Sequence, residues 1–126
     1  MRKSSTPKAA APAALPTWPQ TVALGLVNAE HVLRSLTRQR FEDAEWSNDD
    51  WAVDNAIDLA LVAVQRMRQQ TYKDSSVFEK DWYQVAGVVG LAARGFSGRN
   101  PVYASTLAGL VGLMEVLPEL VEHSWE

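Results

Sequence analysis

The feature that most constrains the fold is a long apolar stretch, residues 101–117, in which Glu115 is the only charged residue. Asn100 can cap the start of a helix there, and Pro101 suits the first helical position, where no N–H is needed. Pro118 lacks an N–H and predicts that the helix ends or kinks near Leu117. A helix that is apolar nearly all round is typical of a protein core.

This apolar stretch is shorter and more polar than a membrane span requires. A bilayer needs roughly 20 predominantly apolar residues, whereas this stretch also contains Ser105, Thr106 and Glu115. We therefore expect a central core helix and no membrane segment.

Four glycines interrupt the two most C-terminal helical segments: Gly87, Gly90, Gly109 and Gly112. Each glycine in a helix interior costs about 1 kcal/mol relative to alanine. Small residues on one stripe allow two helix backbones to approach closely, so we expect residues 76–94 and 101–117 to form the closest pair. Two alternatives stay open. The stripes could leave a groove for a ligand or partner helix, or they could form the interface of a homodimer.

Three further helices follow from apolar residues at three- and four-residue spacing and from capping patterns at their starts. The predicted helices and capping pairs are 18–40 with Thr17 and Gln20, 48–70 with Ser47 and Asp50, and 76–94 with Ser76 and Glu79. Gly95 is placed to end the third helix in a left-handed conformation. The sequence thus predicts an all-α, four-helix bundle-like single domain over residues 17–126.

Residues 1–16 are rich in Ala, Pro, Ser and Thr and include the bases Arg2, Lys3 and Lys8. This composition predicts an extended N-terminal arm, which is either solvated or ordered on a partner. The segment lacks the apolar middle of a signal peptide, so we expect a cytoplasmic location.

Composition excludes several kinds of chemistry. The chain has no cysteine, which excludes disulfides, thiolate nucleophiles and sulfur-bound metals. Its histidines, His31 and His123, lack the spacing of a zinc site, and no Ser-His-acid arrangement is evident. We expect no metal and no cofactor. Ser97 and Arg99 precede a helix start and form a weak candidate anion site, although a plain interhelical turn explains them better.

Three carboxylates, Asp50, Asp54 and Asp58, recur at four-residue spacing along one predicted helix. Like charges at this spacing oppose one another by roughly 0.2–0.5 kcal/mol per pair, so folding alone does not explain them. We expect them to form an exposed acidic ridge, with Trp46 beside it. Glu42 and Glu45 lie just before this helix, and an ordinary solvated face is the plain alternative.

The acidic ridge leads to a functional hypothesis. It predicts a small, non-catalytic intracellular interaction protein, an inhibitor or accessory subunit that docks on a larger complex through this ridge. The partner would be a protein, with nucleoprotein complexes among the candidates. One alternative is a homodimeric structural protein. The other is a Mg²⁺-dependent all-α nucleotide pyrophosphatase, in which Glu42 and Glu45 would pair with Asp54 and Asp58 around the metal.

Overall fold

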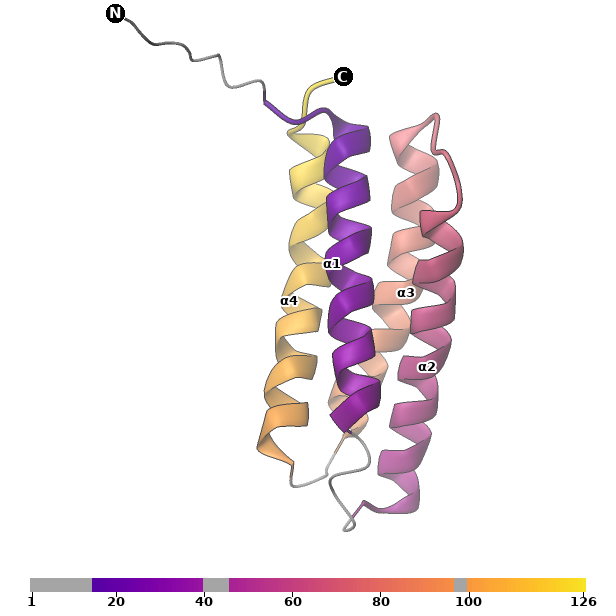
Figure 1. Cartoon of the computed structure of the whole chain (residues 1–126), viewed down its shortest axis with the longest axis vertical. Coiled ribbons are helices and arrows are strands. Elements are labelled where there is room, and N and C mark those ends of the chain that lie inside the picture. Colours follow the sequence, from indigo (N-terminus) through magenta and orange to yellow (C-terminus); the bar gives the residue numbers. More distant parts are fainter. Residues whose placement is uncertain (1–14, 40–45, 97–99) are drawn as a thin grey trace, which may run out of the picture.

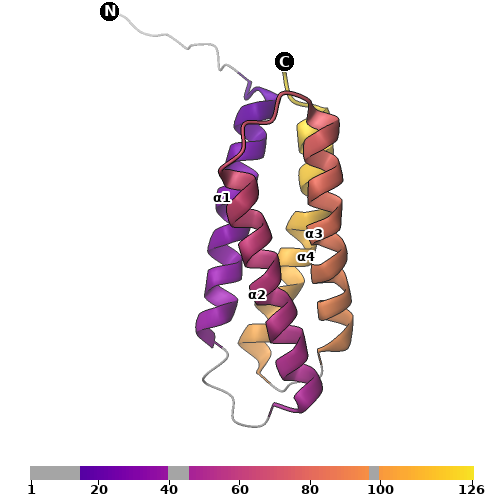
Figure 2. The same cartoon turned by 90° about the vertical axis from the view of Figure 1, so that its right-hand side faces the viewer.

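The computed structural model describes residues 15–39, 46–96 and 100–126. In these residues the chain forms four α-helices: α1 (Trp18–Gln39), α2 (Asn48–Arg68), α3 (Ser75–Gly95) and α4 (Pro101–Glu122). The helices run up and down in turn, and α1 and α4 lie side by side (Figures 1 and 2). The predicted all-α, four-helix bundle-like fold is confirmed.

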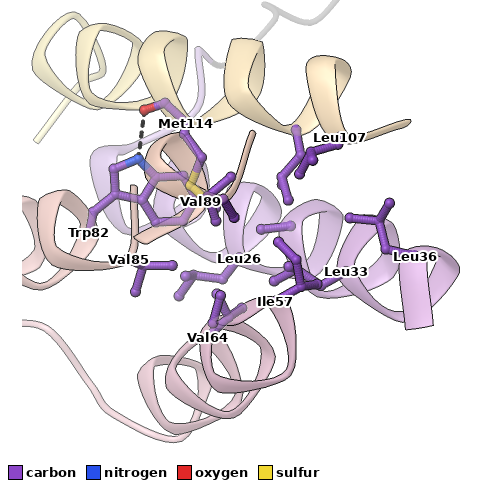
Figure 3. Close-up of a cluster of buried hydrophobic side chains, with 14 of the residues drawn as sticks. Leu26, Leu33, Leu36, Ile57, Val64, Trp82, Val85, Val89, Leu107 and Met114 are labelled. Atoms are coloured by element: carbon purple, nitrogen blue, oxygen red, sulfur yellow. Dashed lines mark hydrogen bonds between the residues drawn. The ribbon is translucent and has the colours of Figure 1, made fainter. Parts of the chain in front are cut away.

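Apolar side chains from all four helices meet in one core. The largest fully buried side chains are Trp82, Tyr103 and Phe78. Figure 3 shows the middle of the core, where Leu26 and Leu33 of α1 face Ile57 and Val64 of α2. Full burial of a side chain of this size contributes about 1.5–3 kcal/mol, so this core is the main source of stability.

Three of the predicted helix starts are confirmed. The Thr17 N–H donates to Oε1 of Gln20 at 2.9 Å, and the Gln20 N–H donates to Oγ1 of Thr17 at 3.3 Å. Ser47 and Asp50 form the same reciprocal pair at the start of α2, at 3.2 Å in both directions. The side-chain oxygen of Asn100 accepts two backbone N–H groups from the first turn of α4, both at 3.0 Å. These bonds satisfy N–H groups that have no partner within the helix.

Both predicted caps of α3 are wrong, although the helix extends only one residue beyond the predicted range at each end. Its N-cap is Asp74, whose Oδ1 accepts the Ser76 N–H at 2.9 Å, and so the helix starts one residue early, at Ser75. Aspartate is as good an N-cap residue as serine, and in this structure Asp74 caps α3 in place of Ser76. Gly95 is the last helical residue and is not left-handed, because Phe96 ends the helix in an extended conformation.

The prediction that the last helix ends near Leu117 is also wrong. α4 continues through Pro118 to Glu122. Proline has no N–H, so the carbonyl of Met114 one turn earlier loses its usual helical donor. The indole Nε1–H of Trp82, on α3, donates to that carbonyl at 2.9 Å in the buried core (Figure 3). A donor from another helix replaces the missing one, and the helix continues.

The largest helix-helix interface joins α1 and α4, so the expectation that the last two helices form the closest pair is wrong. Gly25 of α1 makes this approach possible, since a Cβ there would lie 2.3 Å from Cδ2 of Leu117. A Cβ on any of the four glycines singled out in the sequence would touch no neighbouring helix: Gly87, Gly90, Gly109 and Gly112. Within the bundle, those glycines do not serve close packing.

Glu30 is a buried acid that ties α1 to α2. It is 8% exposed. Oε2 of Glu30 forms an ion pair with Nη2 of Arg34 at 2.8 Å, and Oε1 forms an ion pair with Arg68 of α2. The guanidinium groups of Arg68 and Arg34 lower the pKa of Glu30.

This cluster makes stability depend on pH. A carboxyl whose pKa is lowered by folding stabilises the native state above its ordinary value of 4.5, and this contribution is lost as the pH falls through the lowered value. We expect Glu30→Gln to reduce the free energy of unfolding by about 1 kcal/mol at pH 7, because the half-exposed arginines are screened by water. Urea denaturation should show a smaller difference near about pH 3. Equal losses at both pH values would contradict this reading, and the exposed Glu115→Gln is the matched control.

Candidate functional site

Asp50 and Asp54 lie inside the bundle, at the end where α2 and α4 begin. They are 2% and 1% exposed, and Asp58 is half-buried. The expected exposed acidic ridge is therefore wrong. Asp50 completes the capping pair of α2, and Oδ1 of Asp54 accepts the hydroxyl of Tyr103 on α4 at 3.1 Å. Hydrogen bonds of this kind offset the cost of burying a carboxylate.

Trp46 is also buried, at 7% exposure, and does not present a contact surface as expected. Its ring packs edge-on against three aromatic neighbours, with centroid distances of 4.8 Å to Trp51, 4.9 Å to Tyr103 and 5.5 Å to Phe96. Such pairs contribute about 0.5–1.5 kcal/mol each beyond their buried area. Trp46 and the two aspartates thus belong to the packing of this end of the bundle.

Four residues of the predicted sites lie outside the described residues: Glu42, Glu45, Ser97 and Arg99. The carboxylate pair of a nucleotide pyrophosphatase and the anion site therefore stay predictions. Among the residues that the structure does describe, no group of three or more His, Asp or Glu side chains is placed to hold a metal ion.

The Asp54–Tyr103 contact predicts a measurable loss of stability. Tyr103→Phe removes a donor from a carboxylate that is almost fully buried. We expect the free energy of unfolding to fall by about 1–3 kcal/mol, the usual effect of removing one partner of a buried polar group. The control is Tyr83→Phe, since Tyr83 is 58% exposed. Indistinguishable urea midpoints for the two variants would show that the buried hydroxyl does not matter.

An apolar hollow runs between α1 and α4 in the described part of the chain. This groove, here called the α1/α4 groove, has a volume of about 370 Å³. Four of the large apolar side chains that line it are more than half exposed: Leu15, Leu24, Leu120 and Trp125. Gly25 and Leu117 form its floor where the two helices approach most closely.

Hydrogen bonds between residues 16–21 and residues 124–125 hold this groove in shape. The Trp18 N–H donates to the carbonyl of Trp125 at 2.7 Å, and the Trp125 N–H donates to the carbonyl of Pro16 at 3.2 Å. The hydroxyls of Thr21 and Ser124 are hydrogen-bonded at 2.7 Å. The walls are thus fixed before any partner arrives, which lowers the entropic cost of binding.

Comparison with known protein families, with curated protein sequences and with solved structures gives no match to this chain. The geometry of the groove therefore carries the functional interpretation.

The other hollows are less suited to an apolar partner. A hollow of about 340 Å³ between α2 and α3 has Leu59 on its rim, but Arg66 and Asp81 also line it. A hollow of about 360 Å³ beside Glu30 is lined by charged and amide residues, including the three that form the ion pairs of Glu30. A hollow of about 300 Å³ between α1 and α2 is lined mostly by apolar residues but includes Arg68. The α1/α4 groove is the one of these four whose lining includes no Lys, Arg, Asp or Glu.

The exposed face of α4 adds to this open apolar surface. In the described residues α4 is long and apolar enough to cross a membrane, with a mean hydropathy of 1.5 over its most apolar window, although core helices pass the same test. Only 33% of that window is buried inside the bundle. Sequence reasoning missed the groove because Leu24 and Leu120 stand beside the apolar stripes. Apolar residues off the stripe were the signal that could have found it.

Proposed function

We propose that this protein is a small, non-catalytic interaction protein, an accessory subunit or inhibitor that docks a protein partner in the α1/α4 groove. The observation that carries the proposal is the cluster of exposed Leu24, Leu120 and Trp125 in a groove with fixed walls. Monomeric proteins expose single apolar residues widely, but contiguous exposed apolar surface is typical of an interaction site. A cytoplasmic location and a larger complex as partner, nucleoprotein complexes included, belong to the same proposal.

The groove suits a helical or extended segment better than a small molecule. It is open to solvent, and most of its lining residues belong to the helices α1 and α4. Grooves between helices commonly bind the apolar face of another segment through anchors about one turn apart. Trp and other large apolar residues near the centre of such sites usually supply most of the binding energy.

The buried aspartates do not serve this purpose. Asp50 and Asp54 are enclosed by the bundle, so a partner would have to open its end to reach them. The proposed docking surface is therefore the groove between α1 and α4 and not the carboxylates of α2.

Docking in the groove is tested by placing a photo-cross-linking amino acid at Leu24 of the full chain, in extract of the source cells. The matched control position is Leu59, which is 69% exposed, compared with 63% for Leu24. We expect a discrete protein adduct from position 24 alone. Leu24→Lys should lower the affinity for the captured partner by about tenfold or more, as at a hot spot, whereas Leu59→Lys should not. Equal adducts from both positions would refute docking in the groove.

A homodimer is the second candidate. It is supported by Gly109 and Gly112 of α4, each with open space where a side chain would stand, and by the uncovered apolar face around them. A second copy of α4 could approach closely there. Analytical ultracentrifugation at increasing protein concentration tests it, since Gly109→Leu would weaken such a dimer and leave a monomer unchanged.

A further inference from the structure

We infer, building on the function proposed above, that the segment bound in the α1/α4 groove is basic as well as apolar: a protein segment in which leucine-like anchors alternate with Lys or Arg. The inference comes from the distribution of charge around the groove and from the chemistry of its rim.

The two parts of the chain that build the groove contain no strong base. Residues 15–33 and 100–126 include no Lys and no Arg, although the whole chain has 12. The same parts carry four exposed glutamates: Glu115, Glu119, Glu122 and Glu126. These two parts of the chain are therefore more negative than the chain's net charge of −3 suggests.

The fold itself gives these carboxylates no use. The last turn of α4 contains no base, and the C-terminal end of a helix carries partial negative charge, which disfavours acids there. Both ion pairs found among the described residues belong to Glu30, which lies on the far side of α1. The glutamates at the end of α4 therefore oppose the helix dipole and form no ion pair within the described residues. A basic binding partner would explain their presence.

Two of the glutamates are sequence neighbours of residues that line the groove. Glu119 precedes Leu120, and Glu126 follows Trp125. Lys and Arg side chains lay their methylene stems along apolar surface while the charged group reaches beyond it. A base seated over Leu120 or Trp125 would therefore bring its charge to Glu119 or Glu126.

Trp125 supplies a second contact for a base. Its side chain is 62% exposed on the groove wall. Cations bind the face of an indole ring more strongly than that of any other side chain, and Arg does so more often than Lys. An arginine of the partner could thus stack on Trp125 and pair with the neighbouring Glu126.

The same charges disfavour the other classes of partner. Nucleic acid and the anionic cytoplasmic face of a membrane both require a basic surface, whereas residues 15–33 and 100–126 contain no Lys or Arg. A basic protein segment, in contrast, would be attracted to the groove and would find apolar contacts within it.

The experiment uses the full chain and a fluorescent probe peptide of about 14 residues, roughly four helical turns, built from Leu and Lys with the leucines on one face. A second peptide has Glu in place of every Lys. We expect the Lys peptide to bind at least about tenfold more tightly than the Glu peptide by fluorescence anisotropy, and its affinity to fall as salt is raised. The triple variant Glu119→Gln, Glu122→Gln, Glu126→Gln should weaken binding of the Lys peptide by about tenfold, with the helical circular dichroism spectrum unchanged.

The variants separate the two proposals. If Leu24→Lys abolishes peptide binding while the triple variant binds as the native chain does, the groove stands and the inference of a basic partner fails. If Leu24→Lys has no more effect than Leu59→Lys, docking in the groove fails. Binding of vesicles of anionic phospholipid at the groove, or a dimer that Leu24→Lys dissociates, would also overturn the inference. A gain in peptide affinity on replacing Arg2, Lys3 and Lys8 by Gln would support it, since the chain's own basic segment would then be a competitor.

Discussion

Replacing Trp82 by phenylalanine is expected to lower the free energy of unfolding by about 2–4 kcal/mol. Phenylalanine keeps most of the buried ring contacts but cannot donate to the Met114 carbonyl, which Pro118 leaves without a helical donor. An unsatisfied buried carbonyl costs about 1–3 kcal/mol. The smaller ring leaves a cavity that adds about 1 kcal/mol. Urea denaturation monitored by circular dichroism measures the total.

A double-mutant cycle with Pro118→Ala separates the two causes. Alanine at this position restores a backbone N–H that can reach the Met114 carbonyl, so the hydrogen bond from Trp82 becomes dispensable. We expect Trp82→Phe to cost about 1–2 kcal/mol less in the Pro118→Ala background than in the native chain. Strict additivity of the two substitutions would show that Trp82 acts through packing alone.

The second large effect is expected at Gly25. Gly25→Ala places a Cβ 2.3 Å from Cδ2 and 2.5 Å from Cδ1 of Leu117, so the buried Leu117 side chain must leave its present position. Overpacking of this kind typically costs about 1–3 kcal/mol, and here it would separate the two helices with the largest interface. Thermal and urea denaturation should both report the loss.

Gly109→Ala is the matched control because it is the same substitution in the interior of α4, the helix that packs against α1. Its Cβ would meet no atom within 4 Å. We expect it to stabilise the protein by about 0.5–1 kcal/mol, since alanine favours the helix and nothing obstructs it. The two substitutions should therefore have opposite signs. A stabilising Gly25→Ala would mean that α1 and α4 do not pack as closely as the structure shows.

Local sequence signals predicted most of the fold. The pairs Thr17 with Gln20 and Ser47 with Asp50, and the cap at Asn100, placed three helix starts correctly. These interactions span three residues, so they can be read directly from spacing. The end of α4 was missed for the opposite reason. The local rule at Pro118 was overridden by Trp82, which lies 32 residues from Met114 in the chain.

The candidate site was much less predictable. Asp54 sits next to the apolar row of α2 on the helix surface, only about 60° from Ile57, so spacing alone did not decide which side would be buried. In the fold Asp54 is buried and accepts a hydrogen bond from the Tyr103 hydroxyl of α4, a contact that joins residues 49 positions apart. The α1/α4 groove likewise depends on how Leu24 and Leu120 meet across the bundle. Both features belong to the pairing of helices, which periodicity within one helix does not specify.

The hydrogen bonds between Pro16, Trp18 and Trp125 have a consequence for how quickly the protein folds. They join residues about as far apart in the chain as the described part allows, and the largest interface connects the same first and last helices. Up-and-down bundles are usually fast folders because most of their contacts are local. Docking of α1 on α4 closes a loop that contains α2 and α3, and closing a long loop costs entropy, so we expect this docking to slow folding. A circular permutant that links these ends and opens the turn between α2 and α3 should refold faster than the native chain.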